Sequence, residues 1–323
     1  MSGRPLVWDN HGCMPLRAGD GDFLPQLERY RASGIDVVGL NVGFGLQSLE
    51  EHVRVLAWFR RWLTDHADRY VLVGTIAEAR AAAAAGKLAV FFDIEGTGPL
   101  DAGDLGLVQL FYDLGVRWML MAYNRQTAVG SGCYDETDGG LTAFGRQVLA
   151  EMERVGMLVC CSHTGERSAL EVIEAARAPV IVSHSNAKAV FDHTRNVSDR
   201  VIKAVAASGG VVGVNGVGAF LGDNDASTQT LVAHVDHMVQ LVGPDHVGLG
   251  LDYVFDMTEL VDYLQKMRQT FPHDATYAAD IQFVEPERFP GIAAALVAKG
   301  YGDADLAKIL GGNWTRVAER VWK

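Results

Sequence analysis

Short apolar runs that end in polar residues recur along the chain. They occupy residues 6–11, 36–43, 88–96, 117–124, 157–163, 179–185, 211–218 and 246–253. Most are nearly continuous in apolar residues instead of alternating with polar ones, which is typical of strands covered on both faces. The pattern therefore predicts eight buried strands.

The segments between these runs favour helices. Apolar residues spaced three and four apart occur at 23–34, 50–67, 75–86, 144–156, 168–178 and 197–209, and several of these segments end in glycine, as helices often do. Alternating strands and helices predict a parallel sheet, and eight such units fit a closed (β/α)8 (TIM) barrel of the metal-dependent hydrolase type better than an open doubly wound sheet, which is the alternative. We expect residues 1–323 to form one domain.

Three segments depart from the short connections of an ordinary barrel. Residues 125–140 and 252–288 are long loops, placed after predicted strands, where barrels carry their chemistry. Residues 291–323 predict helices that cap the barrel.

Composition excludes some classes of function. The formal net charge is −12 and no cluster of Lys or Arg is present, so a nucleic-acid partner is not expected. The chain shows neither a secretory leader nor a long apolar membrane segment, which predicts a cytoplasmic protein without a membrane partner. Its four cysteines form no CxxC pair, so metal ligation is a better expectation for them than a disulfide scaffold.

Ionisable residues gather where the predicted strands end. Because the carboxyl ends of all barrel strands meet at one mouth, these residues should converge there. Histidine, cysteine and carboxylate side chains are the ligands that Zn²⁺ takes in proteins. The residues are His11, Cys13, Glu95, His163, His184 and Asp252.

Single members of this set have plainer explanations. His11 and Cys13 are two apart on a strand and share one face. Metal ligation is favoured for His11 over a hydrogen-bonded structural histidine, whereas for Cys13 a small buried cysteine is an equally good explanation. A carboxylate at Glu95 would be costly to bury without a cation, which favours a metal-bridging role over a structural ion pair. Asp252 is expected to act as a general acid and base, with a loop cap as the alternative.

Several longer motifs carry a family resemblance. DNHGCMPLR, FFDIEGTGPL, the block from YNRQTAVGSG to CCSHTG, APVIVSHSNAKAV, RNVSDRVIKAVAASGGVVGVN, GLGLDY and GGNWTRVAERVW span nearly the whole chain. Together they resemble the renal (membrane) dipeptidase family of zinc peptidases, in its soluble bacterial branch.

The resemblance implies a binuclear zinc site. Glu95 would bridge both ions, His11 would bind one of them, and His163 and His184 would bind the other. It also implies that Arg195 pairs with the terminal carboxylate of a dipeptide, and that Asp252 manages the proton of the attacking water.

Two positions depart from the family pattern. Cys13 stands where the family has an aspartate ligand, and because a thiolate is softer than a carboxylate, the site is expected to hold one or two Zn²⁺ ions. Tyr123 stands where the mammalian enzymes have a histidine near the developing oxyanion. Tyr123 either donates a hydrogen bond there or lines the pocket, and Asn124 beside it is predicted to contact substrate.

These observations predict metal-dependent hydrolysis of a dipeptide or a similar small amide, with Asp252 and Glu95 as the catalytic residues. Another small amide, a lactam or an N-acyl amino acid is an alternative substrate, because barrel loops change substrates without changing the metal chemistry. A degenerate barrel that only binds a small metabolite is the alternative that Cys13 suggests. A homodimer is the default expectation for assembly.

Overall fold

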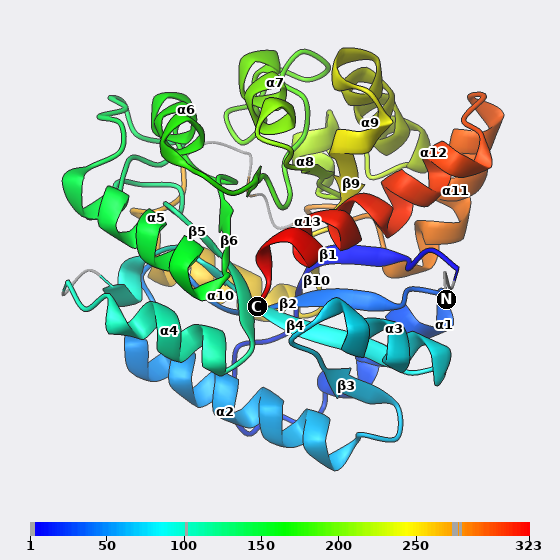
Figure 1. The fold of residues 1–323 in the computed structure, drawn as a ribbon, viewed down its shortest axis with the longest axis horizontal. Coiled ribbons are helices and arrows are strands. Elements are labelled where there is room, and N and C mark those ends of the chain that lie inside the picture. The colour runs from blue at the N-terminus through cyan, green and yellow to red at the C-terminus, as the bar shows by residue number, and fades with distance from the viewer. Residues whose placement is uncertain (1–3, 101–102, 273–276, 278–279) are drawn as a thin grey trace.

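The computed structural model describes residues 4–100, 103–272, 277 and 280–323, in which parallel strands form a barrel surrounded by helices (Figure 1). The barrel strands are β1 (Trp8–Cys13), β2 (Val37–Phe44), β4 (Leu88–Glu95), β5 (Val116–Leu120), β6 (Leu158–Cys160), β7 (Val180–Ile181), β8 (Val212–Val214) and β9 (Val247–Leu249), which leads into β10 (Tyr253–Val254). The predicted (β/α)8 fold is therefore confirmed.

Hydrogen bonding runs around the whole ring. One sheet has the order β10-β1-β2-β4-β5-β6-β7, and β8 pairs with β9. A parallel bridge between Val182 and Val212 joins β7 to β8, and the pairing of Gly12 with Tyr253 joins β1 to β10. These contacts close the barrel, so that all strand ends face one mouth.

Most helices cover the outside of the ring, whereas those at Gly218–Leu221 and Met257–Lys266 lie beside its mouth. The helices of both groups are α1 (Glu28–Ala32), α2 (Leu49–Asp65), α3 (Ile76–Ala84), α4 (Gly106–Asp113), α5 (Ala143–Val155), α6 (Glu166–Ala175), α7 (Asp199–Ala207), α8 (Gly218–Leu221), α9 (Thr228–Val242) and α10 (Met257–Lys266). Ser48 and Thr75 begin α2 and α3 with complete capping boxes, which satisfy backbone N–H groups that a helix start leaves unpaired. Within the described residues, no helix combines the length and the apolar character needed to span a bilayer.

Strand β4 shows how the sheet separates two layers of core. Its outward residues, such as Phe92 and Ile94, pack against the helices, whereas Phe91 packs inside the barrel with Trp8 and Trp118. The period of two continues along the inner face from Phe91 to Asp93 and Glu95. The same alternation that fills the barrel thus delivers two carboxylates to its mouth.

The C-terminal segment forms helices, as predicted, and the last of these helices closes the other end of the barrel. They are α11 (Phe289–Ala298), α12 (Asp303–Ala307), a π-helical turn (Lys308–Gly312) and α13 (Asn313–Val321). Trp314 of α13 inserts between strands, where its Nε1 donates to the Leu249 carbonyl at 3.0 Å. A Cβ on Gly248 would lie 2.5 Å from that nitrogen, so glycine is needed for the close approach.

Replacing Trp314 with alanine should lower the free energy of unfolding by about 3–5 kcal/mol, because it empties a fully packed site and removes a buried hydrogen bond. Chemical denaturation measures this change. Leu110→Ala is the control, since that side chain is 43% exposed and should cost less than about 0.5 kcal/mol. If both variants lowered the free energy of unfolding by a similarly small amount, α13 would not be the helix that closes this end of the barrel.

The sequence prediction missed one strand and overextended others. β3 (Tyr70–Leu72) pairs with the first residues of β4, at Leu88 to Val90, on the edge that β5 occupies further along. Several late strands keep only two or three residues, because the polar ends of the predicted runs turn inward to form the barrel mouth. The predicted loop at 252–288 contains β10, α10 and a short helix at Pro286–Arg288, apart from its residues outside the described ones.

Candidate metal centre

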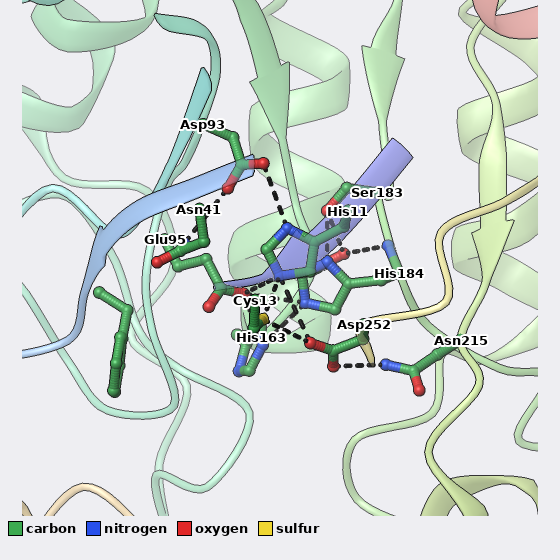
Figure 2. Close-up of polar contacts among 12 residues, drawn as sticks. His11, Cys13, Asn41, Asp93, Glu95, His163, Ser183, His184, Asn215 and Asp252 are labelled. Carbon is green, nitrogen blue, oxygen red and sulfur yellow. Dashed lines mark hydrogen bonds and ion pairs between the residues drawn. The ribbon is translucent and has the colours of Figure 1, made fainter. Parts of the chain in front are cut away.

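The six residues that sequence analysis selected as ligands or catalytic groups converge at the barrel mouth (Figure 2). Glu95, at the end of β4, occupies the middle of the cluster. Its Oε1 lies 3.0 Å from His184 Nε2, 3.3 Å from His163 Nε2 and 3.5 Å from His11 Nε2. One carboxylate oxygen thus faces three imidazole nitrogens.

A second group lies beside the first and shares His11. Asp252 Oδ1 is 3.4 Å from His11 Nε2 and 3.3 Å from Cys13 Sγ, and the sulfur is 3.6 Å from the same nitrogen. The potential ligand atoms of His11, Cys13 and Asp252 lie within 4.8 Å of one another, as do those of His11, Glu95 and His184. The geometry therefore offers two adjacent positions for a cation.

Outer contacts fix the orientation of the imidazoles. His11 Nδ1 lies 3.2 Å from Asp93 Oδ2, and His163 Nδ1 lies 2.7 Å from Asn124 Oδ1. Carboxylate and amide oxygens accept hydrogen bonds, so Nδ1 is the donor in both rings and Nε2 is the nitrogen that faces the site. His184 Nδ1 pairs with Ser183 Oγ at 2.8 Å. This is the second layer of contacts that metal-binding histidines usually have.

The donor set fits a divalent cation. His163 Nε2 and His184 Nε2 lie 3.0 Å apart, and Glu95 Oε1 is buried without a hydrogen-bond partner among the described residues. A contact this short between two imidazole nitrogens is favourable only when one of them carries a proton or when both bind a cation. Imidazole, thiolate and carboxylate together form a ligand set suited to zinc.

Burial controls the ionisation of the cluster. It raises the pKa of Glu95 to about 8 and lowers the pKa of both His163 and His184 well below the usual histidine value. Burial also raises the pKa of the Cys13 thiol, so a cation would have to displace its proton on binding. For Asp252 burial acts in the same upward direction, but nearby His184 and His11 outweigh it and hold its pKa below the ordinary value.

The backbone turns sharply where these side chains leave their strands. Asn124, His163 and Asp252 have φ values of 60°, 59° and 58°, a region that residues other than glycine seldom adopt. Each follows a barrel strand and is held by a hydrogen bond or ion pair within the cluster. Such strain is commonly retained at functional sites because the surrounding contacts compensate for it.

Two predicted substrate-binding residues lie close to the cluster, with different surroundings. Tyr123 stacks on His163 with ring centroids 4.3 Å apart and lines the cavity above the centre. Asn124 is fully buried and its side-chain oxygen is engaged by His163, which favours a positioning role over a substrate contact.

Arg195 lies behind the cluster. Its Nη1 donates to Ser185 Oγ at 3.0 Å and its Nη2 donates to the His184 carbonyl at 3.2 Å. The buried Nε has no partner among the described residues, so the guanidinium keeps donors that a ligand oxygen could accept from. However, Arg195 is not among the residues that line the main cavity.

The outer contacts of the cluster were not predicted from the sequence. Asp93 contacts His11, Asn41 Nδ2 donates to Asp93 at 3.2 Å, and Asn215 Nδ2 donates to Asp252 Oδ2 at 2.9 Å. A signal for Asp93 was present, because it lies two residues before Glu95 on the same face of a strand. Asn41 and Asn215 lie near predicted strand ends but carry no spacing that reveals their partners.

A mainly apolar cavity lies above the cluster. Its floor includes Cys13, Glu95, His163 and Asp252. Its walls are formed by Met14, Leu16, Phe44, Tyr123, Val217, Phe220, Val254, Leu260, Tyr263, Phe271, Tyr277, Ile281 and Phe283, together with Asn41, Asp256 and Glu259. An apolar pocket with polar groups converging at one end is typical of a small-molecule site.

A closed (β/α)8 barrel with histidines and carboxylates clustered at its mouth defines the class of metal-dependent hydrolases. Within that class the chain belongs to the membrane dipeptidase family, peptidase family M19, whose sequence profile matches residues 26–269.

Two curated relatives are similar over about two thirds or more of the chain. An uncharacterized protein from the pqqA 5′ region of Klebsiella pneumoniae is 34% identical over 247 residues, which are 73% of this chain and 83% of that protein. An uncharacterized dipeptidase of Schizosaccharomyces pombe is 33% identical over 227 residues, which are 69% of this chain but only 50% of the yeast protein.

Solved structures share the fold over the whole chain. An amidohydrolase from Pseudomonas aeruginosa has a TM-score of 0.89 at 27% identity and covers 98% of this chain and 97% of its own. A metallopeptidase of family M19, dipeptidase AC, has a TM-score of 0.78 at 25% identity and covers 99% of both chains. Membership in a metallopeptidase family agrees with the ligand cluster at the barrel mouth.

Proposed function

We propose that this protein is a zinc-dependent hydrolase of dipeptides or closely similar small amides. The observation that carries the proposal is the position of the Glu95 carboxylate among three imidazoles, beside a second group that contains Cys13 and Asp252. When bound, one or two zinc ions would lower the pKa of the attacking water and polarise the scissile carbonyl.

The protein would hold the metal with residues from separate strands. His163, His184 and Glu95 would form one position, and His11 with Cys13 would form the other, bridged by Glu95. Asp93 and Asn124 would keep two of the imidazoles oriented through their Nδ1 hydrogen bonds. Rigid strands would thus hold the reacting groups in fixed relative positions.

Asp252 would move the proton during hydrolysis. Asn215 holds one of its oxygens, and the other faces His11 and Cys13 on the floor of the cavity. Because its lowered pKa keeps it ionised, Asp252 would accept the proton of the attacking water and pass it to the leaving amine. Tyr123, in the cavity wall, would contact the substrate near the scissile bond.

Arg195 would bind the free carboxylate of a dipeptide through its buried guanidinium. Because Arg195 does not line the main cavity, hydrolysis of another small amide, without that carboxylate, is the second candidate. We also expect the protein to be cytoplasmic and to form a homodimer. Size-exclusion chromatography with light scattering would test whether it is a dimer.

An Arg195→Ala variant separates these two substrates. We expect kcat/KM for a dipeptide to fall about 100-fold, while kcat/KM for the matching C-terminal amide stays within about 2-fold, because only the dipeptide has a carboxylate to pair with the guanidinium. Steady-state kinetics on the zinc-loaded protein measures both values. Arg200→Ala, on the outer helix α7, is the control. Equal losses for both substrates would indicate that Arg195 only supports His184.

A further inference from the structure

The main cavity has one wall that the reaction described above does not use. Leu16 follows β1, Phe44 ends β2, and Leu260 and Tyr263 belong to α10. All four line the cavity above Cys13. The rings of Phe44 and Tyr263 meet edge to face, with centroids 4.9 Å apart, so the aromatic part of this wall is a packed surface.

The wall lies across the barrel from Arg195. Around the closed ring of β1, β2, β4, β5, β6, β7, β8 and β9 with β10, β2 is the second strand and β7 the sixth, so they are opposite each other. Phe44 ends β2, and Arg195 lies in the connection that follows β7. If the carboxylate of the leaving group binds Arg195, as in the proposed function, the acyl side of the substrate would point toward the wall. This orientation rests on the proposed function.

The carboxylates near this wall share one cation, Arg17, whose guanidinium also lies 2.7 Å from Asp20. Arg17 lies 2.8 Å from Asp256 and 3.3 Å from Glu259. Asp256 also accepts from the backbone N–H of Thr258 at 2.9 Å, and Glu259 accepts from that of Leu16 at 3.0 Å.

The hydroxyl of Tyr263 is engaged as well, since it accepts from Gln47 Nε2 at 3.0 Å. Among the described residues of this wall, none offers an unpaired charge to a charged substrate group. The carboxylates beside the wall outnumber Arg17, so burying an acidic side chain here would be costly, whereas burying an apolar one is favourable.

We propose that the wall of Leu16, Phe44, Leu260 and Tyr263 selects substrates with a large apolar group on the acyl side of the scissile amide. A leucine-like or phenylalanine-like side chain has the required chemistry. The group belongs either to the N-terminal residue of a dipeptide or to the acyl part of an N-acyl amino acid, and both present the same apolar surface to the wall.

The first test compares kcat/KM for Leu-Ala, Phe-Ala, Gly-Ala and Glu-Ala on the zinc-loaded protein. The leucine and phenylalanine substrates are expected to exceed glycine and glutamate by about 10-fold or more, since hydrophobic pockets discriminate by such factors. N-Acetylleucyl-alanine, in the same assay, shows whether the free amine is required. Equal values for Leu-Ala, Gly-Ala and Glu-Ala would overturn the inference.

A matched pair of variants on one helix locates the effect. Leu260→Ala should reduce kcat/KM for Leu-Ala about 10-fold and leave Gly-Ala within about 2-fold. Leu264→Ala makes the same chemical change one turn later, at a residue that does not line the cavity, and should leave both substrates unchanged. A uniform loss for both substrates in Leu260→Ala would assign that residue to stability instead of selection.

A binding measurement keeps this inference separate from the proposed function. Isothermal titration with L-leucine and with glycine, the acyl-side products, does not require turnover. Leucine is expected to bind about 10-fold more tightly than glycine, and Leu260→Ala should remove the difference. If the protein prefers leucine to glycine but hydrolyses no dipeptide, only the dipeptidase assignment is rejected. If the two amino acids bind equally well, the selective role of the apolar wall is rejected.

Discussion

Glu95→Gln is expected to weaken zinc binding by more than about 100-fold. The change removes the charge of the one oxygen that lies within 3.5 Å of three imidazole nitrogens. Losing an outer contact of a metal-bound histidine already costs about 10–100-fold in affinity, so losing a charged ligand should cost more. Elemental analysis after dialysis, together with competition against a zinc chelator, measures the affinity.

The control for this prediction is Glu259→Gln. Glu259 is a carboxylate of the same cavity, but it pairs with Arg17 and with the backbone, so its variant should keep its zinc. Circular dichroism of both variants should match the unmodified protein. Unchanged zinc affinity in Glu95→Gln would mean that this carboxylate serves only as an ion-pair partner of buried histidines.

Asp252→Asn is expected to lower kcat by about 10²–10⁴-fold with little change in KM. Asparagine keeps the size of the side chain but cannot accept the proton of the attacking water, and positioned acid–base groups contribute about this factor. The zinc content should stay close to that of the unmodified protein, because His11, Glu95, His163 and His184 remain. Steady-state kinetics gives kcat and KM, and elemental analysis of the same preparation gives the zinc content.

Asp262→Asn, at an exposed position on α10, is the control for the removal of one negative charge. It should have full activity. Undiminished turnover in Asp252→Asn would eliminate the proton-transfer role. Loss of zinc together with activity would instead place Asp252 among the essential ligands.

Much of the fold was accessible from the sequence because barrel strands are buried on both faces. Such strands leave long apolar runs that contrast with the amphipathic helices between them. β3 was missed because Tyr70 to Leu72 is too short for a periodic signal, and it is stabilised by pairing with the first residues of β4. The shortening of β7 to Val180–Ile181 was not predictable either, since residues after it bend to place Ser183 and His184.

Some residues of the candidate site could also be predicted from the sequence, and others could not. Residues directly after strands, such as Glu95 and His184, were predictable because the barrel brings all strand ends together. The contacts of Asp93 with His11 and of Asn215 with Asp252 join strands far apart in sequence, so no local spacing encodes them. The part of the apolar wall that α10 contributes also has no sequence signature, because the apolar face of this helix resembles that of any helix packed on a core.

The most direct test of the proposed zinc peptidase centre is a paired measurement of zinc content and dipeptide turnover. Both are determined for the unmodified protein, purified without chelator, and for Cys13→Asp, which restores the ligand type usual in the family. We predict at least one zinc ion, and about two if the Cys13 thiolate completes the second position, with turnover that a chelator abolishes and zinc restores. The proposal would be contradicted if the unmodified protein retained no zinc and hydrolysed no dipeptide, whereas Cys13→Asp bound zinc and hydrolysed dipeptides.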